Sequence, residues 1–295
     1  MLHVIIPALF VVVWSTGFIV AKAALPHADL QLFLLIRLSV TAIAMGAFAA
    51  VARGKWPRGV QIGHQLLAGV LLQGVYLCFS YLAITHGMAA GVMALLGALQ
   101  PLFTGLIVAV RGTQLPARIW VGLLIGFAGV ICVLAPKLAA TDAGALSWFA
   151  VLAAVISVSG VTAGSLLQKG LAPVDLRAAA SIQNVGGAVV AFAMTVVAST
   201  RHWDNSLQLW GALSYSVGIA SIVGYTLLMW MLRHGEATRV TALILLVPPL
   251  AAIQAYFFFH ETLAPIQFVG FVLALAGVLL ARSAGRTRLA TSQSR

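Results

Sequence analysis

An internal repeat constrains this chain more than any other feature of its sequence. When residues 86–130 are aligned without gaps to residues 234–278, 14 of 45 positions are identical. The chain is rich in Ala, Leu, Val and Gly, and such a composition would give about four or five identities by chance. A weaker match, offset by 147 residues, pairs Lys22 with Lys169 and extends the repeat upstream. We therefore predict a first repeat at residues 1–135, a linker at 136–145, a second repeat at 146–283 and a basic tail at 284–295.

Composition predicts that both repeats lie in a membrane. The chain is 62% hydrophobic and 8% charged, which is too little polar side chain to cover a water-soluble protein of 295 residues. Runs long enough to cross about 30 Å of hydrocarbon as helices occur at residues 4–24, 30–51, 66–85, 89–110, 116–135, 146–168, 177–199, 208–231, 239–259 and 265–282. Stretches such as 119–134 are apolar on every side, which disfavours a β-barrel. The sequence predicts an all-α integral membrane protein of ten transmembrane helices.

The distribution of positive charge predicts the orientation of these helices. If the N-terminus is cytoplasmic, 13 Lys and Arg residues fall on the cytoplasmic side and three on the outer side. This asymmetry satisfies the positive-inside rule, so we expect both termini in the cytoplasm. We expect the first apolar run to remain as an uncleaved helix, because it lacks a basic start. Five helices per repeat is an odd number, so the two repeats are predicted to be inverted relative to each other.

Several short motifs point to a known family. They are Trp14-Ser15-Thr16-Gly17-Phe18 with Lys22, Pro26 and Arg37, the region of Gly87 and Pro101, the ending Gly122–Gly129, and His260-Glu261-Thr262-Leu263 before Gly270 and Gly277. Over residues 4–282 the chain resembles the EamA-type transporters of the drug/metabolite transporter superfamily. The resemblance implies ten helices, cytoplasmic termini and, most often, export of small metabolites or amino acids. Thr113 departs from the pattern because it stands where the second repeat has Glu261, so we expect that acid to act only on the outer side.

Polar residues recur on matching faces of the third and eighth spans. Gln73, Tyr76 and Ser80 have the spacing of one narrow helix face, and Ser221, the repeat counterpart of Gln73, lies with Tyr225 on a similar face. Such groups need polar partners at membrane depth, which a binding site or a neighbouring helix would supply. The predicted substrate-binding residues are Trp14, Ser15, Arg37, Gln73, Tyr76, Ser80, Gln100, Ser159, Thr162, Asn184, Ser221, Tyr225 and Gln254.

Arg37 lies inside the second span, about 10 Å along its helix. A cation at such a depth costs about 2.5 kcal/mol or more unless it faces protein, water or a partner. One interpretation is an anchor for a substrate carboxylate, or an outer gate pair with Asp29 or Glu261. The other is a side chain that reaches the outer interface or bonds to helix carbonyls.

Prolines and glycines mark breaks and close contacts at repeat-related positions. Pro101, Pro248 and Pro249 fall near the middle of the fourth and ninth spans, where each removes a helix hydrogen bond. We predict them to be hinges, with a packing role as the alternative. A stripe of small residues in the fifth span matches one in the tenth and predicts close packing of these spans, or of two subunits. Its members are Gly122, Gly126, Gly129, Gly270, Ala274 and Gly277.

Together these features favour a secondary transporter that exports a small amphipathic metabolite, such as an amino acid, across a bacterial inner membrane by alternating access. All six acidic residues lie at loops or helix ends, which favours facilitated export over a buried proton relay. The alternatives are an intramembrane enzyme, for which an H-E-x-x-H motif is missing, and a channel, for which charged rings are missing. We predict no catalytic residues, no metal and no cofactor. The expected partners are a small-molecule substrate and the lipid bilayer, without nucleic acid, in a monomer or homodimer.

Overall fold

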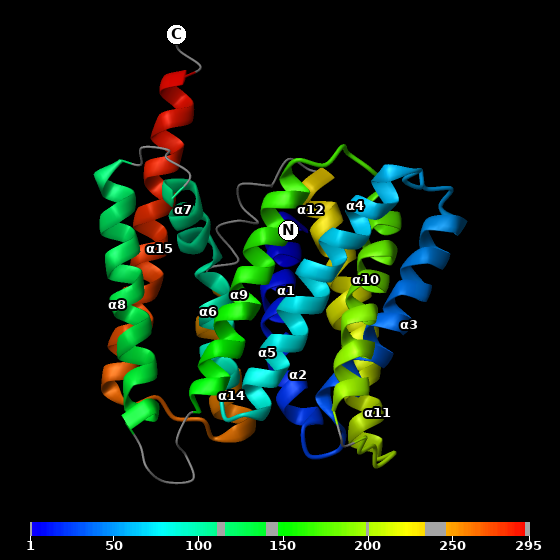
Figure 1. Ribbon diagram of the computed structural model, residues 1–295, viewed down its shortest axis with the longest axis horizontal. Coiled ribbons are helices and arrows are strands. Elements are labelled where there is room, and N and C mark those ends of the chain that lie inside the picture. Colours follow the sequence, from blue (N-terminus) through cyan, green and yellow to red (C-terminus); the bar gives the residue numbers. More distant parts are fainter. Residues whose placement is uncertain (1, 111–115, 140–146, 199–200, 234–245, 293–295) are drawn as a thin grey trace.

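The computed structural model describes residues 2–110, 116–139, 147–198, 201–233 and 246–292, and these residues form an all-helical bundle (Figure 1). The first half contains α1 (Leu2–Ser15), α2 (Gly17–Ala24), α3 (Leu30–Val51), α4 (Val60–Gly69), the π-helix η1 (Val70–Val75), α5 (Tyr76–Thr85), α6 (Ala90–Ala98), α7 (Gln100–Val110) and α8 (Ala117–Ala139). The second half contains α9 (Trp148–Lys169), α10 (Leu176–Val197), α11 (Leu207–Ser214), the π-helix η2 (Tyr215–Val223), α12 (Gly224–Arg233), α14 (Val247–Phe259) and α15 (Pro265–Ser292).

These helices give the ten spans that the sequence predicts. Among the described residues, eight helical stretches, two of them with a one-residue break, are long and apolar enough to cross a membrane, and shorter apolar helices occupy Val247–Phe259 and Pro265–Ala281. Residues 239–245 of the ninth predicted span lie outside the described part of the chain. The third span begins at Val60, six residues earlier than predicted, and α15 continues to Ser292, into the predicted tail.

The start of α3 matches the start of α10, which shows the inversion. Both helices are 22 residues long, and an aspartate caps each one, because the carboxylates of Asp29 and Asp175 accept hydrogen bonds from the first free N–H groups. The two helices run in opposite directions in Figure 1 and pack against each other. We call the end of the bundle at Lys22 and Asp29 the Lys22 end, and the opposite end, at Arg53, the Arg53 end.

Repeat-related helices pack in pairs across the two halves. Besides α3 and α10, α6 packs against α14 and α8 against α15. The α8–α15 pair depends on the predicted small-residue stripe. A Cβ on Gly122 would lie 2.7 Å from the carbonyl oxygen of Gly277, and one on Gly270 would lie 2.6 Å from that of Gly129. The stripe therefore packs the fifth span against the tenth within one chain, because only glycine lets the two backbones approach this closely.

Four of the described spans are interrupted, and the first of them breaks at Thr16, between α1 and α2. The fourth span breaks at Leu99, between α6 and α7 and two residues before Pro101, as that proline predicts. The third and eighth spans pass through η1 and η2, and η1 maps inside η2 when the 148-residue offset between residues 86–130 and 234–278 is continued upstream. Pro248 and Pro249 lie in the first turn of α14, where a missing N–H leaves no helix hydrogen bond unmade, so the prediction that each of these two removes a helix hydrogen bond is wrong.

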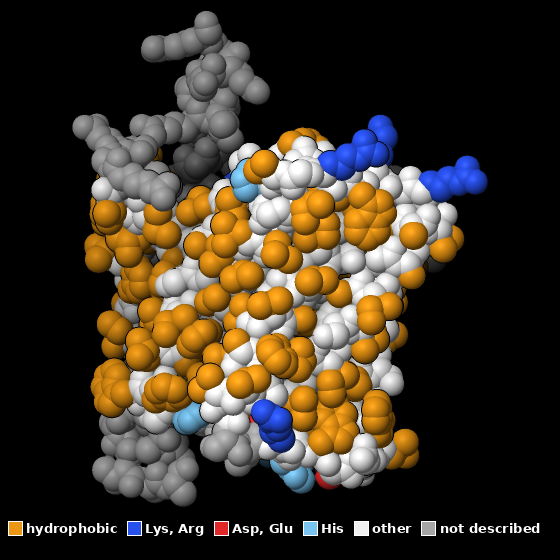
Figure 2. Space-filling model, turned by 45° about the vertical axis from the view of Figure 1, so that its right-hand side comes forward, with side chains coloured by type: hydrophobic (Ala, Val, Ile, Leu, Met, Phe, Trp, Pro, Cys, Tyr) orange, Lys and Arg blue, Asp and Glu red, His pale blue; other side chains and the backbone are white. Residues whose placement is uncertain are grey.

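The surface matches a lipid environment. Hydrophobic side chains cover the middle of the face in Figure 2, and Lys and Arg side chains lie towards its two ends. Large apolar residues such as Ile43, Leu124 and Phe257 are exposed, which is the normal state of side chains that meet lipid.

Candidate functional site

A hydrogen bond between Gln73 and Tyr225 joins the two halves at mid-membrane. The amide Nε2 of Gln73, on η1, donates to the hydroxyl of Tyr225, which follows η2, over 2.6 Å. Both side chains are only partly buried. The Cβ of Gln73 and a methyl group of Leu38 both lie next to Gly187 of α10. Gln73 therefore lies beside α3 as well as beside α10. A polar side chain of the π-helix η1 thus meets one from the first turn after the π-helix η2, and π-helical turns occur frequently at functional sites.

Tyr76 lies next to the break in the fourth span. Its hydroxyl is 2.9 Å from the position that a Cβ on Gly97 would take, so only glycine leaves room for it. The ring of Phe18 packs edge-on against the Tyr76 ring. Tyr76 therefore contacts the first and fourth spans, close to the backbone that Pro101 interrupts.

Further polar contacts join the first span to the second half. Gln254 of α14 donates to the hydroxyl of Ser15 over 2.9 Å, and Tyr215 of η2 donates to the hydroxyl of Thr16 over 3.0 Å. The carbonyl oxygen of the Gln254 side chain is buried without a partner among the described residues. The break between α1 and α2 at Thr16 is thus held by two helices of the other half.

Arg37 does not form either of the predicted gate pairs. Its Nη1 donates over 2.8 Å to the hydroxyl of Tyr81, whereas Asp29 caps α3 and Glu261 pairs with Lys22. The prediction of an Asp29 or Glu261 partner is therefore wrong. The reason is that the Asp29 carboxylate caps its own helix by accepting from the Gln31 N–H, and Lys22 lies closer to the membrane surface than Arg37 does.

Several other predicted residues are used in packing. Ser80 and Ser157 share a 2.7 Å hydrogen bond between α5 and α9. Thr162, Asn184 and Ser221 donate to backbone carbonyls of their own helices, at Val158, Ala180 and Ser216. Ser159 lies on the exposed face of α9 that Leu152 and Val155 share, Trp14 is 40% exposed against Phe10, and Gln100 is half-buried at the start of α7.

The single polar face predicted for Gln73, Tyr76 and Ser80 does not occur. Gln73 contacts the eighth span, Tyr76 contacts the first and fourth, and Ser80 contacts the sixth. The predicted spacing assumes 3.6 residues per turn, but the wider turns of η1 change the angle between Gln73 and the residues that follow.

Polar contacts between the two halves close the Lys22 end. The ammonium group of Lys22 pairs with Glu261, in the segment between α14 and α15, and lies over the ring of Phe259. The segments before α3 and before α11 pair through a β-bridge between Ala28 and Trp203.

A second ion pair joins those two segments. The His27 Nδ1 is 2.6 Å from the carboxylate of Asp204. Hydrogen bonds from Ser206, and then from His27, lower the pKa of Asp204 to about 2. Asp204 therefore remains charged at every pH at which a cell lives.

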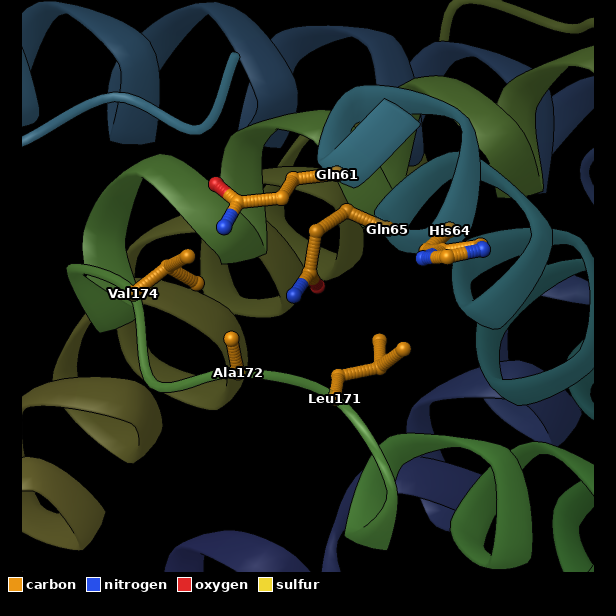
Figure 3. Close-up of a pocket in the computed structure, with 6 residues that line it drawn as sticks. All are labelled: Gln61, His64, Gln65, Leu171, Ala172 and Val174. Carbon is orange, nitrogen blue, oxygen red and sulfur yellow. The ribbon is translucent and has the colours of Figure 1, made fainter. Parts of the chain in front are cut away.

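A pocket at the Arg53 end is too small to be the main site. Figure 3 shows its lining, with Gln61, His64 and Gln65 from α4 facing Leu171, Ala172 and Val174. Its empty volume of about 180 Å³ includes open solvent, whereas pockets for small molecules measure about 300–1,000 Å³. Among the residues described, no three His, Cys, Asp or Glu side chains gather as metal ligands would.

The sequence prediction missed several of these residues. Thr16, Tyr81 and Tyr215 lie beside predicted residues. The surrounding sequence is almost uniformly apolar, so it does not indicate which hydrogen-bond partner a hydroxyl group will have. Only the pairing of His27 with Asp204 had a usable signal, because a histidine and an aspartate, which can bond to each other, lie in two loops predicted on the same side.

Comparison with known proteins agrees with this architecture. The sequence profile of the EamA-like transporter family matches residues 1–135 and again residues 145–283. The chain is 26% identical over 287 residues to a probable amino-acid metabolite efflux pump of Escherichia coli (strain K12), covering 94% of this chain and 93% of that protein. It is 28% identical over 283 residues to a protein of the same description from Salmonella typhimurium, with 92% of each chain covered.

Two more distant likenesses extend over most of the chain. The uncharacterized inner membrane transporter YedA of Escherichia coli (strain K12) is 23% identical over 272 residues, covering 91% of this chain and 87% of that protein. One solved crystal structure has the same fold, with a TM-score of 0.60, 20% sequence identity and coverage of 94% of this chain and 96% of that one. Because the family profile covers both halves of the sequence, the chain belongs to the EamA-like transporter family.

Proposed function

We propose that this chain is a secondary transporter that exports a small amphipathic metabolite, an amino acid or a similar compound, across a bacterial inner membrane by alternating access. The observation that carries the proposal is the closure of the Lys22 end by contacts between the two halves, with partly buried Gln73 and Tyr225 meeting at mid-membrane. Inverted repeats of this kind alternate between two facing states around a shared site. The probable amino-acid metabolite efflux pumps among the relatives support the substrate class.

The proposed site combines aromatic and polar side chains. Phe18 and Tyr76 offer apolar ring faces beside the break in the fourth span, and Gln73 and Tyr225 offer hydrogen-bonding groups. A few placed polar groups in an otherwise apolar surface suit a solute with one polar and one apolar end. In this proposal the Lys22 end faces outward, both termini are cytoplasmic, and the hinge is at Pro101 with Pro248 and Pro249.

Transport by purified protein in liposomes tests this function. Saturable counterflow of radiolabelled amino acids or related metabolites is expected. Gln73→Ala, Tyr76→Ala and Tyr225→Ala should each lower the rate about tenfold or more at unchanged folded yield, while Ser159→Ala, on the exposed face of α9, should transport like the parent. Normal transport by all three variants would place the site elsewhere, and chemical conversion of the solute without counterflow would remove the proposal.

The orientation needs a separate experiment. Reporter domains fused after Arg58 and after Arg295 should report the cytoplasm, and a reporter near Ala143 should report the outer side. Finding Arg58 and Ala143 on the same side would contradict the proposed orientation.

A further inference from the structure

Arg37 is a buried cation without an acidic partner. Arg37 is only 9% exposed, its Nη1 donates to the neutral hydroxyl of Tyr81, and its Nε has no hydrogen-bond partner among the residues that the structure describes. The ion pairs among the described residues are Lys22–Glu261, His27–Asp204 and Asp175–Arg177, and none includes Arg37. A phenol can accept a hydrogen bond but cannot neutralise the charge, so the cost of a cation at this depth is only partly offset.

The repeat-related position in the second half is satisfied and neutral. Because α3 and α10 begin at equivalent aspartates, Arg37 corresponds to Gln183. The Gln183 side chain donates over 2.8 Å to the side-chain oxygen of Gln65, on α4. Beside it, a Cβ on Gly186 would lie 2.9 Å from the backbone nitrogen of Val70, so the two helices touch through their backbones. The backbone of α10 thus packs directly against α4 and η1 at this position.

The corresponding contact in the first half has unsatisfied polar groups instead. Thr41 stands where α10 has Gly187, one turn beyond Arg37, and within the described part of the chain its buried hydroxyl has no partner. The same holds for the buried hydroxyl of Ser216, on η2, which contacts α3. Ser216 and Arg37 lie about 10–14 Å from the starts of their helices at the same end of the bundle. Buried polar groups without partners call for a water or a ligand.

The charge of this site restricts the ligand. A carboxylate bound at the free Nε–H of Arg37 would form a charge-assisted hydrogen bond and make the complex neutral. The ammonium group of a zwitterion would then remain without a counter-charge, because all six acidic residues of the chain lie at loops or helix ends. A singly charged organic acid leaves no such excess charge in the membrane.

We propose that Arg37 binds the carboxylate of a singly anionic organic acid, such as a 2-oxo acid or an N-acylated amino acid, in preference to a zwitterionic amino acid. Tyr81 positions the guanidinium group, and Thr41 and Ser216 hydrogen-bond to the polar atoms next to the carboxylate. The inference rests on the proposed transport function and specifies its substrate class.

Four probes with one carbon skeleton test this assignment in proteoliposomes: leucine, its 2-oxo acid, N-acetylleucine and leucinamide. The parent protein should take up the two acids at least tenfold more efficiently than leucine or leucinamide. Arg37→Gln should abolish this preference. Arg37→Lys, which keeps the charge, and Tyr81→Phe, which removes only the neutral hydrogen bond, should keep the preference for acids with a higher KM.

The outcomes separate the two proposals. Equal uptake of leucine and its 2-oxo acid by the parent, or an unchanged ratio of acid to amide in Arg37→Gln, would overturn the role of Arg37 while transport stands. If Arg37→Gln fails to fold, the folded Arg37→Lys and Tyr81→Phe variants decide the question. An equal loss of uptake of all four probes in these variants would assign Arg37 a structural role and overturn the proposal. Absence of saturable uptake of all four probes would overturn both proposals.

Discussion

The two ends of the molecule differ although the two halves share one helix plan. Lys22 and Lys169 are repeat counterparts, but Lys22 pairs with Glu261, whereas Lys169 is exposed and takes part in no ion pair among the described residues. The position related to Glu261 is Thr113, so the carboxylate that would complete a second pair is missing from the sequence. An inverted repeat would stabilise two facing states equally only if its closing contacts were repeated, and here they are not. Among the described residues, the Lys22 end is thus closed by an ion pair between the two halves for which the Arg53 end has no counterpart.

The largest effect on folding stability is expected where α10 packs against α4 and η1, a contact that we expect in both facing states. In Gly186→Leu the new side chain would meet the backbone of α4 and η1, and overpacking against backbone should cost about 3 kcal/mol or more. Folded yield and melting temperature should both fall. The control is Val40→Leu at the repeat-related position of α3, which is 43% exposed and should stay within about 0.5 kcal/mol of the parent. Equal losses in the two variants would show that the halves are packed alike.

A smaller difference is expected between the two aspartate caps. Asp175 accepts hydrogen bonds from two backbone N–H groups and Asp29 from one, so Asp175→Ala should cost about 1–2 kcal/mol and Asp29→Ala about half as much. The hydrogen bond from the Arg177 side chain is the main cause that lowers the pKa of Asp175 to about 2.

The lowered pKa of Asp175 determines in which direction the stability of the protein changes with pH. The Asp175 cap should stabilise fully above the unfolded pKa of about 4 and lose its effect as pH falls towards 2. Melting temperatures of parent and Asp175→Asn should therefore differ by a constant amount between pH 5 and 8 and converge below about pH 4. A difference in melting temperature that changes between pH 6 and 8 would mean that a titratable group other than Asp175 is responsible.

Breaking the ion pair at the Lys22 end should shift the balance of facing states. Glu261→Gln removes a partly exposed pair worth about 1 kcal/mol, which corresponds to about a fivefold change in populations. A single cysteine at position 18, one turn from Lys22, should then react faster with a membrane-impermeant reagent in a background without Cys78 and Cys132. The charge reversal Lys22→Glu with Glu261→Lys should restore the parent rate, and failure to do so would assign Glu261 another role.

The smallest expected effect comes from adding the missing carboxylate. Thr113→Glu should stabilise closure of the Arg53 end through Lys169 and increase labelling at position 18 about twofold. The effect should vanish when Lys169 is replaced by Gln. An increase that survives in Thr113→Glu/Lys169→Gln would mean that the new charge acts without Lys169.

The fold could be predicted from the sequence more completely than the site. Length and hydropathy give the spans, because crossing a bilayer requires about 20 apolar residues, and the glycine spacing gave the α8–α15 contact correctly. The partners of individual polar groups could not be predicted. Ser80 and Gln73 are both polar residues of the third span, but Ser80 bonds to the sixth span and Gln73 bonds to a tyrosine of the eighth. Arg37 was identified by its depth alone, but its bond to Tyr81 depends on how the second and third spans are rotated.

The π-helices η1 and η2 make the third and eighth spans sensitive to helical phase. A turn that closes one residue later than an α-turn rotates everything after it by about 100° relative to a continuous α-helix. The part of each span on one side of the π-helix can therefore keep its packing while the other part turns a different set of side chains inward. A one-residue deletion within Val70–Val75 would leave composition and hydropathy almost unchanged, yet it would present a different row of residues to Tyr225. The identity of the side chains that face the other half is thus encoded by residue count as well as by residue type.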